Sequence, residues 1–215
     1  MACPITPTYL WFLGAFLCGS VPFGLLLMRL AGKGDVRAKG SGNIGATNVM
    51  RVGGKGLGIA TLLLDVAKGF LPVFLAGRAG MGPGLLGFLA LTAVLGHVFT
   101  PWLKFQGGKG VATAMGGVLG YHAAMVLPAL VVFVLLVLVF RYVSLGSIMA
   151  ALTLFLTALG LFGAWATLAV PANVCPGRWS LLAWALLAGL VIVKHHANIG
   201  RLVHGTESRF WGPKN

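Results

Sequence analysis

The chain has 215 residues, of which 58% are hydrophobic and 9% are charged, and its mean hydropathy is +0.95. Soluble domains carry roughly 25% charged residues, so this composition excludes a soluble globular protein and predicts an all-α integral membrane protein with a single domain, residues 1–215. The 16 Lys and Arg outnumber the 3 Asp and Glu. This excess of basic residues is expected to lie in cytoplasmic loops, where it would attract anionic lipid head groups. Nucleic acid is not an expected partner, because the sequence has no long soluble basic segment.

Seven apolar segments predict a compact bundle of about seven transmembrane helices, some of them short. A helix needs roughly 17–25 apolar residues to cross the hydrocarbon core. In chain order the segments are 8–30, 57–77, 84–99, 111–121, 123–140, 143–164 and 179–193. The fourth is short and rich in small residues, and if it is re-entrant the bundle has five or six spans instead.

The basic residues between these segments set the expected orientation, because Lys and Arg gather in cytoplasmic loops. Only Arg78 and Arg178 fall on the opposite side, and an odd number of spans then places the N-terminus outside and the C-terminus in the cytoplasm. Arg29, the first basic residue, follows the first apolar run, so that run is expected to remain as a helix and not to be a signal peptide. The residues expected on the cytoplasmic side are Lys33, Arg37, Lys39, Arg51, Lys55, Lys104, Lys109, Arg141, Lys194, Arg201, Arg209 and Lys214.

A polar, glycine-rich box, GSGNIGATNVMR, spans residues 40–51. It contains the pattern GxGxxG, but no strand–turn–helix context supports a dinucleotide-binding fold. Glycine amides beside a cation form anion-binding nests, and Arg51 can place two parallel hydrogen bonds on a phosphate. A flexible cytoplasmic loop is the alternative, although the polar side chains are concentrated for a spacer. The candidate binding residues are Gly40, Ser41, Gly42, Asn43, Thr47, Asn48 and Arg51.

A second glycine-rich segment, FQGGKGVAT, spans residues 105–113. It is not a P-loop, because Gly110 follows Lys109 where Ser or Thr is required and Leu103 occupies the first glycine position. The physical mechanism could still be shared. The amides of Gly107, Gly108 and Gly110, the charge of Lys109 and the N-terminus of the following helix all favour an anion. The alternative is a basic turn next to the membrane.

A third segment, KHHANIGRLVHGTE, spans residues 194–207. His195 and Asn198 are three residues apart and would share one face of a helix; a basic helix end that favours its dipole is the alternative. Asp65 and Lys68, also three apart, lie inside the second apolar segment, where a structural ion pair is expected over a catalytic couple. His97, at the inner end of the third segment, is either a ligand contact or a polar interfacial residue.

In order and spacing, these segments together resemble the bacterial acyl-phosphate-dependent glycerol-3-phosphate acyltransferase family over nearly the whole chain. One small departure exists, because the family has proline directly after the equivalent of Phe99, whereas this chain has Thr100 and then Pro101. A local change at the start of that loop is expected. The resemblance rests on GSVPFG (19–24), DVRAKGSGNIGATNVMR (35–51), LLLDVAKG (62–69), GHVF (96–99), KFQGGKGVAT (104–113), RYVSLGS (141–147) and KHHANIGRLVHGTE (194–207).

The resemblance implies acyl transfer from acyl phosphate to the 1-hydroxyl of glycerol 3-phosphate, giving 1-acylglycerol 3-phosphate and inorganic phosphate, in a bacterial cytoplasmic (inner) membrane. The implied partners are the two substrates and membrane lipids, with no obligatory protein partner, no cofactor and no metal. Cys3, Cys18 and Cys175 likewise lack metal-ligand spacing.

Arg51 and Lys109 are expected to neutralise phosphate charge in the implied reaction. By resemblance, Ser41, His195 and Asn198 join them around glycerol 3-phosphate as parts of one shared site. The glycine amides of the second segment are also candidates to stabilise the oxyanion or the departing phosphate.

No histidine of the chain has an Asp five residues later, so the His-x-x-x-x-Asp pattern of the acyltransferases that use acyl-CoA or acyl carrier protein is absent. Three alternatives for the proton transfer and the route of the acyl group therefore stay open. A phosphate oxygen of the substrate could accept the proton, His195 could accept it, or Ser41 could form an acyl-enzyme. Two other functional classes also fit glycine-rich anion sites in a membrane protein: a transporter or channel for a phosphate-bearing solute, and a non-catalytic lipid-binding scaffold. Clustering of the boxes on one side and the lack of an inverted repeat favour the enzyme.

Overall fold

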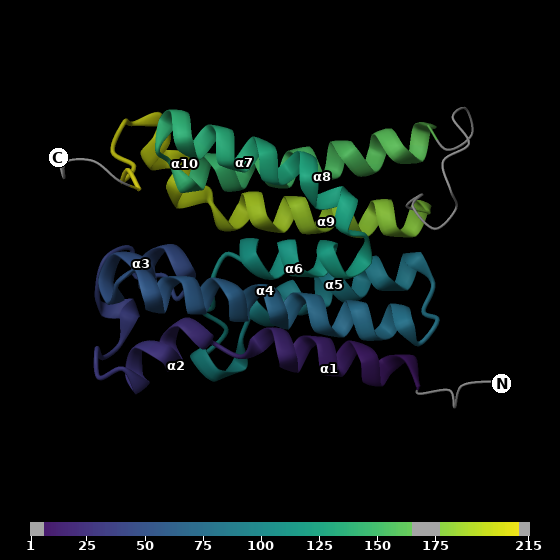
Figure 1. The fold of residues 1–215 in the computed structure, drawn as a ribbon, viewed down its shortest axis with the longest axis horizontal. Helices are drawn as coiled ribbons and strands as arrows, with labels where there is room; N and C mark the ends of the chain where they lie inside the picture. Colours follow the sequence, from purple (N-terminus) through teal and green to yellow (C-terminus); the bar gives the residue numbers. More distant parts are fainter. Residues whose placement is uncertain (1–6, 165–176, 211–215) are drawn as a thin grey trace. The chain divides into compact units, whose positions relative to one another are not determined.

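The computed structural model describes residues 7–164 and 177–210, and every regular element in these two ranges is a helix. Cys3 and Cys175 lie outside the described residues. The chain forms two compact units, Met1–Tyr121 and His122–Asn215, and each is described by itself below (Figure 1). The expectation of a single domain stays a prediction.

The first unit holds the first four predicted segments, and all four are helical. The first of them is broken at Val21 and Pro22, with a bend of 41°. Proline lacks an N–H and its ring collides with the preceding turn, so Pro22 ends one helix and the next begins at Phe23. The helices are α1 (Thr8–Ser20), α2 (Phe23–Leu30), α3 (Ala46–Gly53), α4 (Lys55–Arg78), α5 (Pro83–Val98) and α6 (Val111–Tyr121), with short turns η1 (Val36–Ala38) and η2 (Pro101–Leu103).

The second unit holds the last three predicted segments, again all helical. In it α7 packs on α8, and α8 packs on α9. At His195 the chain bends by 56° into a further short helix. The elements are η3 (Ala123–Met125), α7 (Val126–Phe140), α8 (Val143–Ala164), α9 (Arg178–Lys194) and α10 (His196–Val203).

The described helices confirm an all-helical membrane fold. Four are long and apolar enough to cross a membrane, and six segments qualify when each bent pair is one span. The eleven-residue α6 is the remaining segment of the predicted seven. Exposed apolar side chains such as Leu63, Leu135 and Val139 suit contact with lipid.

Glycines allow α4 and α6 to pack with their backbones in contact. A Cβ at Gly69 would collide with the Thr113 carbonyl, and one at Gly116 with the Val66 carbonyl. Close packing through small residues is typical of membrane helices. These contacts make α6 run parallel to α4 and begin beside its middle, so the loop that precedes α6 lies at the level of mid-α4.

Gly116→Ala is expected to lower the free energy of unfolding by about 1–3 kcal/mol, because neither backbone can move aside without repacking. Gly160→Ala is the matched control, since Gly160 lies inside α8 and a Cβ there meets nothing within 4 Å. Unfolding in mixed detergent micelles measures both variants. Equal effects of the two substitutions would contradict the packing account.

Candidate functional site

The first glycine-rich box is half loop and half helix. Residues 40–45 form a loop, and α3 begins at Ala46, so Thr47, Asn48 and Arg51 lie on a helix. Gly40 and Gly42 have φ values of 62° and 71°, which only glycine adopts without strain. The alternative of a flexible loop throughout the box is therefore wrong for its second half.

Asn48 organises this loop from inside. Its side chain is buried, and its Nδ2 donates to the carbonyls of Val36, Lys39 and Asn43 at 2.8–3.2 Å. Its Oδ1 accepts from the Ser41 amide at 2.9 Å. The amide group of Asn48 thus holds the loop backbone in place, and this presents the exposed Ser41 at its surface. Substrate contact by Asn48 itself stays a prediction.

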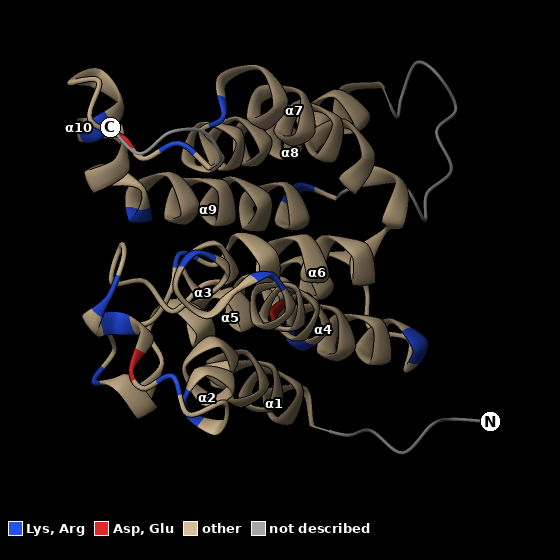
Figure 2. Ribbon diagram, turned by 60° about the vertical axis from the view of Figure 1, so that its left-hand side comes forward, with Lys and Arg blue, Asp and Glu red and all other residues tan. Residues whose placement is uncertain are grey.

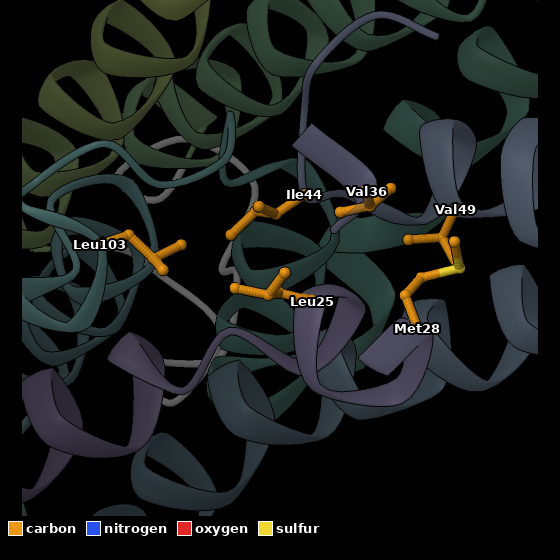
Figure 3. Close-up of a cluster of buried hydrophobic side chains, with 6 residues drawn as sticks. All are labelled: Leu25, Met28, Val36, Ile44, Val49 and Leu103. Atoms are coloured by element: carbon orange, nitrogen blue, oxygen red, sulfur yellow. The ribbon is translucent and has the colours of Figure 1, made fainter. Parts of the chain in front are cut away.

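One cluster of buried apolar side chains packs against the loop of residues 40–45. Ile44 carries the loop into this cluster and packs with Leu25 of α2 (Figure 3). Leu103, from η2 just before the second glycine-rich segment, belongs to the same cluster. The two glycine-rich segments of the first unit therefore share one core. Its buried members are Leu25, Met28, Val36, Ile44, Val49 and Leu103.

Charge around the box leaves Arg51 without a competing acid. Lys and Arg gather on the loops next to α2 and α3 (Figure 2). Asp35 lies here too, but it pairs with Arg37 at 2.6 Å and Arg29 at 3.4 Å. The Arg37 hydrogen bond holds the pKa of that carboxyl well below its usual range. Arg51 is exposed, and no carboxylate of the described chain lies within ion-pair distance of it.

The second glycine-rich segment folds back on the end of α5. The amides of Gly107 and Gly108 donate to the carbonyls of Val98 and His97 at 3.0 and 3.2 Å. A Cβ at Gly108 would collide with the His97 ring, so close approach to α5 requires glycine here. The amides of Gly107 and Gly108 are thus engaged within the protein in this conformation, and substrate binding by these two glycines stays a prediction. The group suited to an anion is Lys109 with Gly110 and the first-turn amides of α6.

The predicted ion pair inside α4 is confirmed. Lys68 Nζ lies 2.8 Å from Asp65 Oδ1, and both side chains are buried. Lys68 also donates to the Val21 carbonyl at 2.7 Å. His97 Nδ1 lies 3.9 Å from the same carboxylate oxygen, and the His97 side chain is buried in the protein interior.

In the second unit His195 is buried at the junction of α9 and α10. Its Nδ1 lies 2.7 Å from the Val191 carbonyl. A carbonyl only accepts hydrogen bonds, so we assign the proton of the neutral ring to Nδ1, which leaves Nε2 as the basic nitrogen. Asn198 follows one turn later, on α10.

Glu207 anchors this region, and sequence reasoning gave it no role. Its Oε1 accepts from Ser144 at 2.7 Å and Asn198 at 2.6 Å, and its Oε2 accepts from Arg201 at 2.7 Å. Burial raises the pKa of Glu207, but these hydrogen bonds outweigh burial and lower the pKa below its ordinary value. One signal was present in the sequence, because Glu207 is the one acidic residue after Asp65.

The five predicted catalytic residues therefore have two separate scaffolds. Ser41, Arg51 and Lys109 belong to the first unit; His195 and Asn198 belong to the second. Within the described ranges, no three His, Cys, Asp or Glu side chains gather as metal ligands.

Comparison with known proteins identifies the family. The sequence pattern of the family described as glycerol-3-phosphate acyltransferase matches residues 9–205. A glycerol-3-phosphate acyltransferase of Trichlorobacter lovleyi is 48% identical over 207 residues, which cover 96% of this chain and 99% of that protein. One of Geobacter sulfurreducens is 48% identical over 197 residues, covering 91% and 94% of the two chains.

Two solved structures are also similar, and both are of PlsY (YgiH), an integral membrane glycerol 3-phosphate acyltransferase. Its glycerol 3-phosphate form has a TM-score of 0.82 and 39% identity, covering 95% of this chain and 96% of that one. Its lysophosphatidic acid form has a TM-score of 0.79 and 38% identity, covering 94% of each chain. The chain belongs to the glycerol-3-phosphate acyltransferase family and is an integral membrane enzyme.

Proposed function

We propose that this enzyme transfers a fatty acyl group from acyl phosphate to the 1-hydroxyl of glycerol 3-phosphate. The products are 1-acylglycerol 3-phosphate (lysophosphatidate) and inorganic phosphate, in the first acylation of phospholipid synthesis. The observation that carries the proposal is the arrangement of charge in the first unit. Its two acidic side chains, Asp35 and Asp65, are each paired with other cations, so Arg51 is left to bind an anionic substrate.

The acceptor phosphate is bound by the first glycine-rich box. Arg51 forks onto two phosphate oxygens, and the Ser41 hydroxyl donates a further bond. Lys109, at the N-terminus of α6, meets the negative charge that grows on the donor as phosphate departs. The acyl chain lies between helices, which suits the depth of this loop beside the middle of α4.

The reaction needs one bond to form and one to break. The 1-hydroxyl oxygen attacks the acyl carbon, the bond from that carbon to the bridging oxygen breaks, and phosphate leaves with the bridging oxygen. Acyl phosphate is an activated mixed anhydride, so modest help with the proton is sufficient. Asn198 and Ser41 act on the glycerol 3-phosphate, while His195 Nε2 accepts the hydroxyl proton; a phosphate oxygen of the substrate is the alternative acceptor.

His195→Gln is expected to lower the turnover rate at saturating substrate by about 10²-fold or more, the usual contribution of a general base. His196→Gln is the control, because His196 is the exposed neighbour and its Nδ1 contacts a carbonyl in the same way. Near-normal turnover of His195→Gln would assign the proton to the substrate phosphate. Trapping an acylated Ser41 would instead replace direct transfer with a covalent intermediate.

The proposed location is a bacterial cytoplasmic membrane, with the N-terminus outside and the C-terminus in the cytoplasm. In the first unit, Lys55 begins α4 and Arg78 ends it, and Lys33 donates to the Gly53 carbonyl just before α4. The positive-inside rule makes the end with the two lysines cytoplasmic. Reporter fusions at the C-terminus test this. A reporter active only outside the cytoplasm would overturn the orientation.

The experiment that tests the proposed function uses purified protein in vesicles supplied with acyl phosphate and glycerol 3-phosphate. Lysophosphatidate and phosphate are both measured, and acyl-CoA is offered in a parallel sample. We expect product with acyl phosphate and none with acyl-CoA. Uptake of glycerol 3-phosphate into the vesicles without product would support the transport alternative.

A further inference from the structure

The break between α1 and α2 exposes backbone carbonyls inside the membrane-spanning region. Pro22 has no N–H, and the bend takes the carbonyls of Ser20 and Val21 out of the regular helical ladder. A polar backbone group without a partner is costly in a membrane, where water is absent. The partners of these two carbonyls therefore decide whether the break is stable.

Both carbonyls accept hydrogen bonds from side chains far away in the sequence, and the Val21 carbonyl also accepts a local bond from the Phe23 amide at 3.1 Å. Thr100 Oγ1 donates to the Ser20 carbonyl at 2.7 Å, and Lys68 Nζ donates to the Val21 carbonyl at 2.7 Å. Both donors are buried, with exposed fractions of 0% for Thr100 and 2% for Lys68. A third bond, from Trp102 Nε1 to Ser20 Oγ at 2.8 Å, ties the same point to η2.

Asp65 lowers the energetic cost of burying the Lys68 ammonium group. The carboxylate lies 2.8 Å from Lys68 Nζ and neutralises it, whereas an unpaired buried cation would be costly. Lys68 is thus held between one carboxylate and one carbonyl, and its position fixes where the chain turns from α1 into α2.

Each glycine-rich segment is connected to this break by contacts of its own or of the residues just before it. Gly24 of α2 packs on the Ile44 carbonyl of the first segment, since a Cβ there would collide with it. Thr100 lies just before η2, whose Leu103 joins the apolar cluster under the same loop. The break is therefore the point at which α4, the first glycine-rich segment and the second one are linked.

We propose that Lys68 and Thr100 are positioning residues, which clamp the α1–α2 break and so fix the placement of Ser41 and Arg51 relative to Lys109. The consequence for catalysis rests on the proposed function; the clamp itself does not. The Thr100 hydroxyl thereby links η2 to the end of α1, which lies 80 residues earlier in the sequence.

Two sets of variants remove one half of the clamp each. Thr100→Val keeps the shape and removes the hydroxyl. Asp65→Asn combined with Lys68→Met removes the cation without leaving an unpaired carboxylate, a change that folded proteins often tolerate. Thr92→Val is the matched control, because Thr92 also donates to a backbone carbonyl, but Thr92 lies on α5 and its acceptor, Phe88 at 2.8 Å, belongs to the same helix.

The direct readout is the distance distribution between spin labels at Lys39 and Lys104, measured by pulsed electron paramagnetic resonance. Both residues are exposed, each lies next to one glycine-rich segment, and neither is placed in the catalytic machinery. The native cysteines are replaced by serine in this background. We expect Thr100→Val and the double variant to broaden or shift the distribution, while Thr92→Val superimposes on the parent protein.

Activity gives the second readout. The kcat/KM for glycerol 3-phosphate is expected to fall roughly fivefold or more in Thr100→Val, with the midpoint of thermal unfolding close to that of Thr92→Val. If the double variant does not fold, the spin-label distance and the activity of Thr100→Val alone test the clamp. An unchanged label distance in Thr100→Val overturns the clamp. An inactive parent protein with a changed label distance overturns the proposed function and leaves the clamp standing.

Discussion

Replacing Arg51 with alanine is expected to lower kcat/KM for glycerol 3-phosphate by about 10²–10⁴-fold. The physical reason is the loss of two charge-assisted hydrogen bonds to phosphate, each of about 1.5–3 kcal/mol. A factor of ten in rate or affinity corresponds to about 1.4 kcal/mol. Steady-state kinetics with acyl phosphate held at saturation measures the change.

The control for Arg51 is Arg78→Ala, because both arginines are exposed, but Arg51 lies on α3, just before α4 begins, whereas Arg78 lies at the C-terminal end of α4. It should retain the parent activity. Arg51→Lys separates charge from geometry: lysine keeps the cation but not the planar fork, so a partial loss is expected. Equal activities of Arg51→Ala and Arg78→Ala would contradict the placement of the acceptor phosphate on the first glycine-rich box.

Glu207→Ala is the second change with a large expected effect, and it acts on stability as well as activity. Three hydrogen-bond donors lose their acceptor, among them the nearly buried Asn198. The expected loss is about 2–3 kcal/mol of the free energy of unfolding, since one partner of a charged, partly buried network is removed. Activity should fall with it, because the Asn198 amide is no longer held. Detergent unfolding and kinetics at low temperature measure the two effects.

The pH dependence of the free energy of unfolding also reports the contribution of Glu207. The pKa of Glu207 is lower in the folded protein than its ordinary value of 4.5, so its contribution is full above that value. The contribution is lost as the pH falls through the folded pKa. Glu207→Gln should therefore flatten the acid limb of the stability curve. Asp35→Asn serves as the contrast, because Asp35 is more exposed than Glu207 and solvent screens its pairs. A larger stability loss from Asp35→Asn would contradict this ranking.

Local chemistry explains which features the sequence could predict. Apolar length located all seven helical segments, because hydrocarbon contact is a property of each segment alone. The three-residue spacing of Asp65 and Lys68 predicted their ion pair for the same reason, since both lie on one helix. Phosphate binding by Ser41 and Arg51 of the first box stays a prediction from the sequence, whereas the helical state of the second half of the box was not predicted.

Features that depend on contacts between distant segments were missed. The Gly107 and Gly108 amides looked available for an anion, because only the folded chain brings the end of α5 against them. Lys68 looked complete with Asp65, yet it also holds the Val21 carbonyl, which Pro22 takes out of the helix. The network of Glu207 spans 63 residues to Ser144, and no local pattern indicates it.

The most direct measurement follows the bridging oxygen of the acyl donor. Acyl phosphate labelled there with oxygen-18 is given, with glycerol 3-phosphate, to purified protein in vesicles. Attack at the acyl carbon predicts one labelled phosphate for each lysophosphatidate formed, and an equal fall in the rates of both products in Arg51→Ala. Unlabelled phosphate with the label retained in a free fatty acid, or no lysophosphatidate at all, would contradict acyl transfer from acyl phosphate.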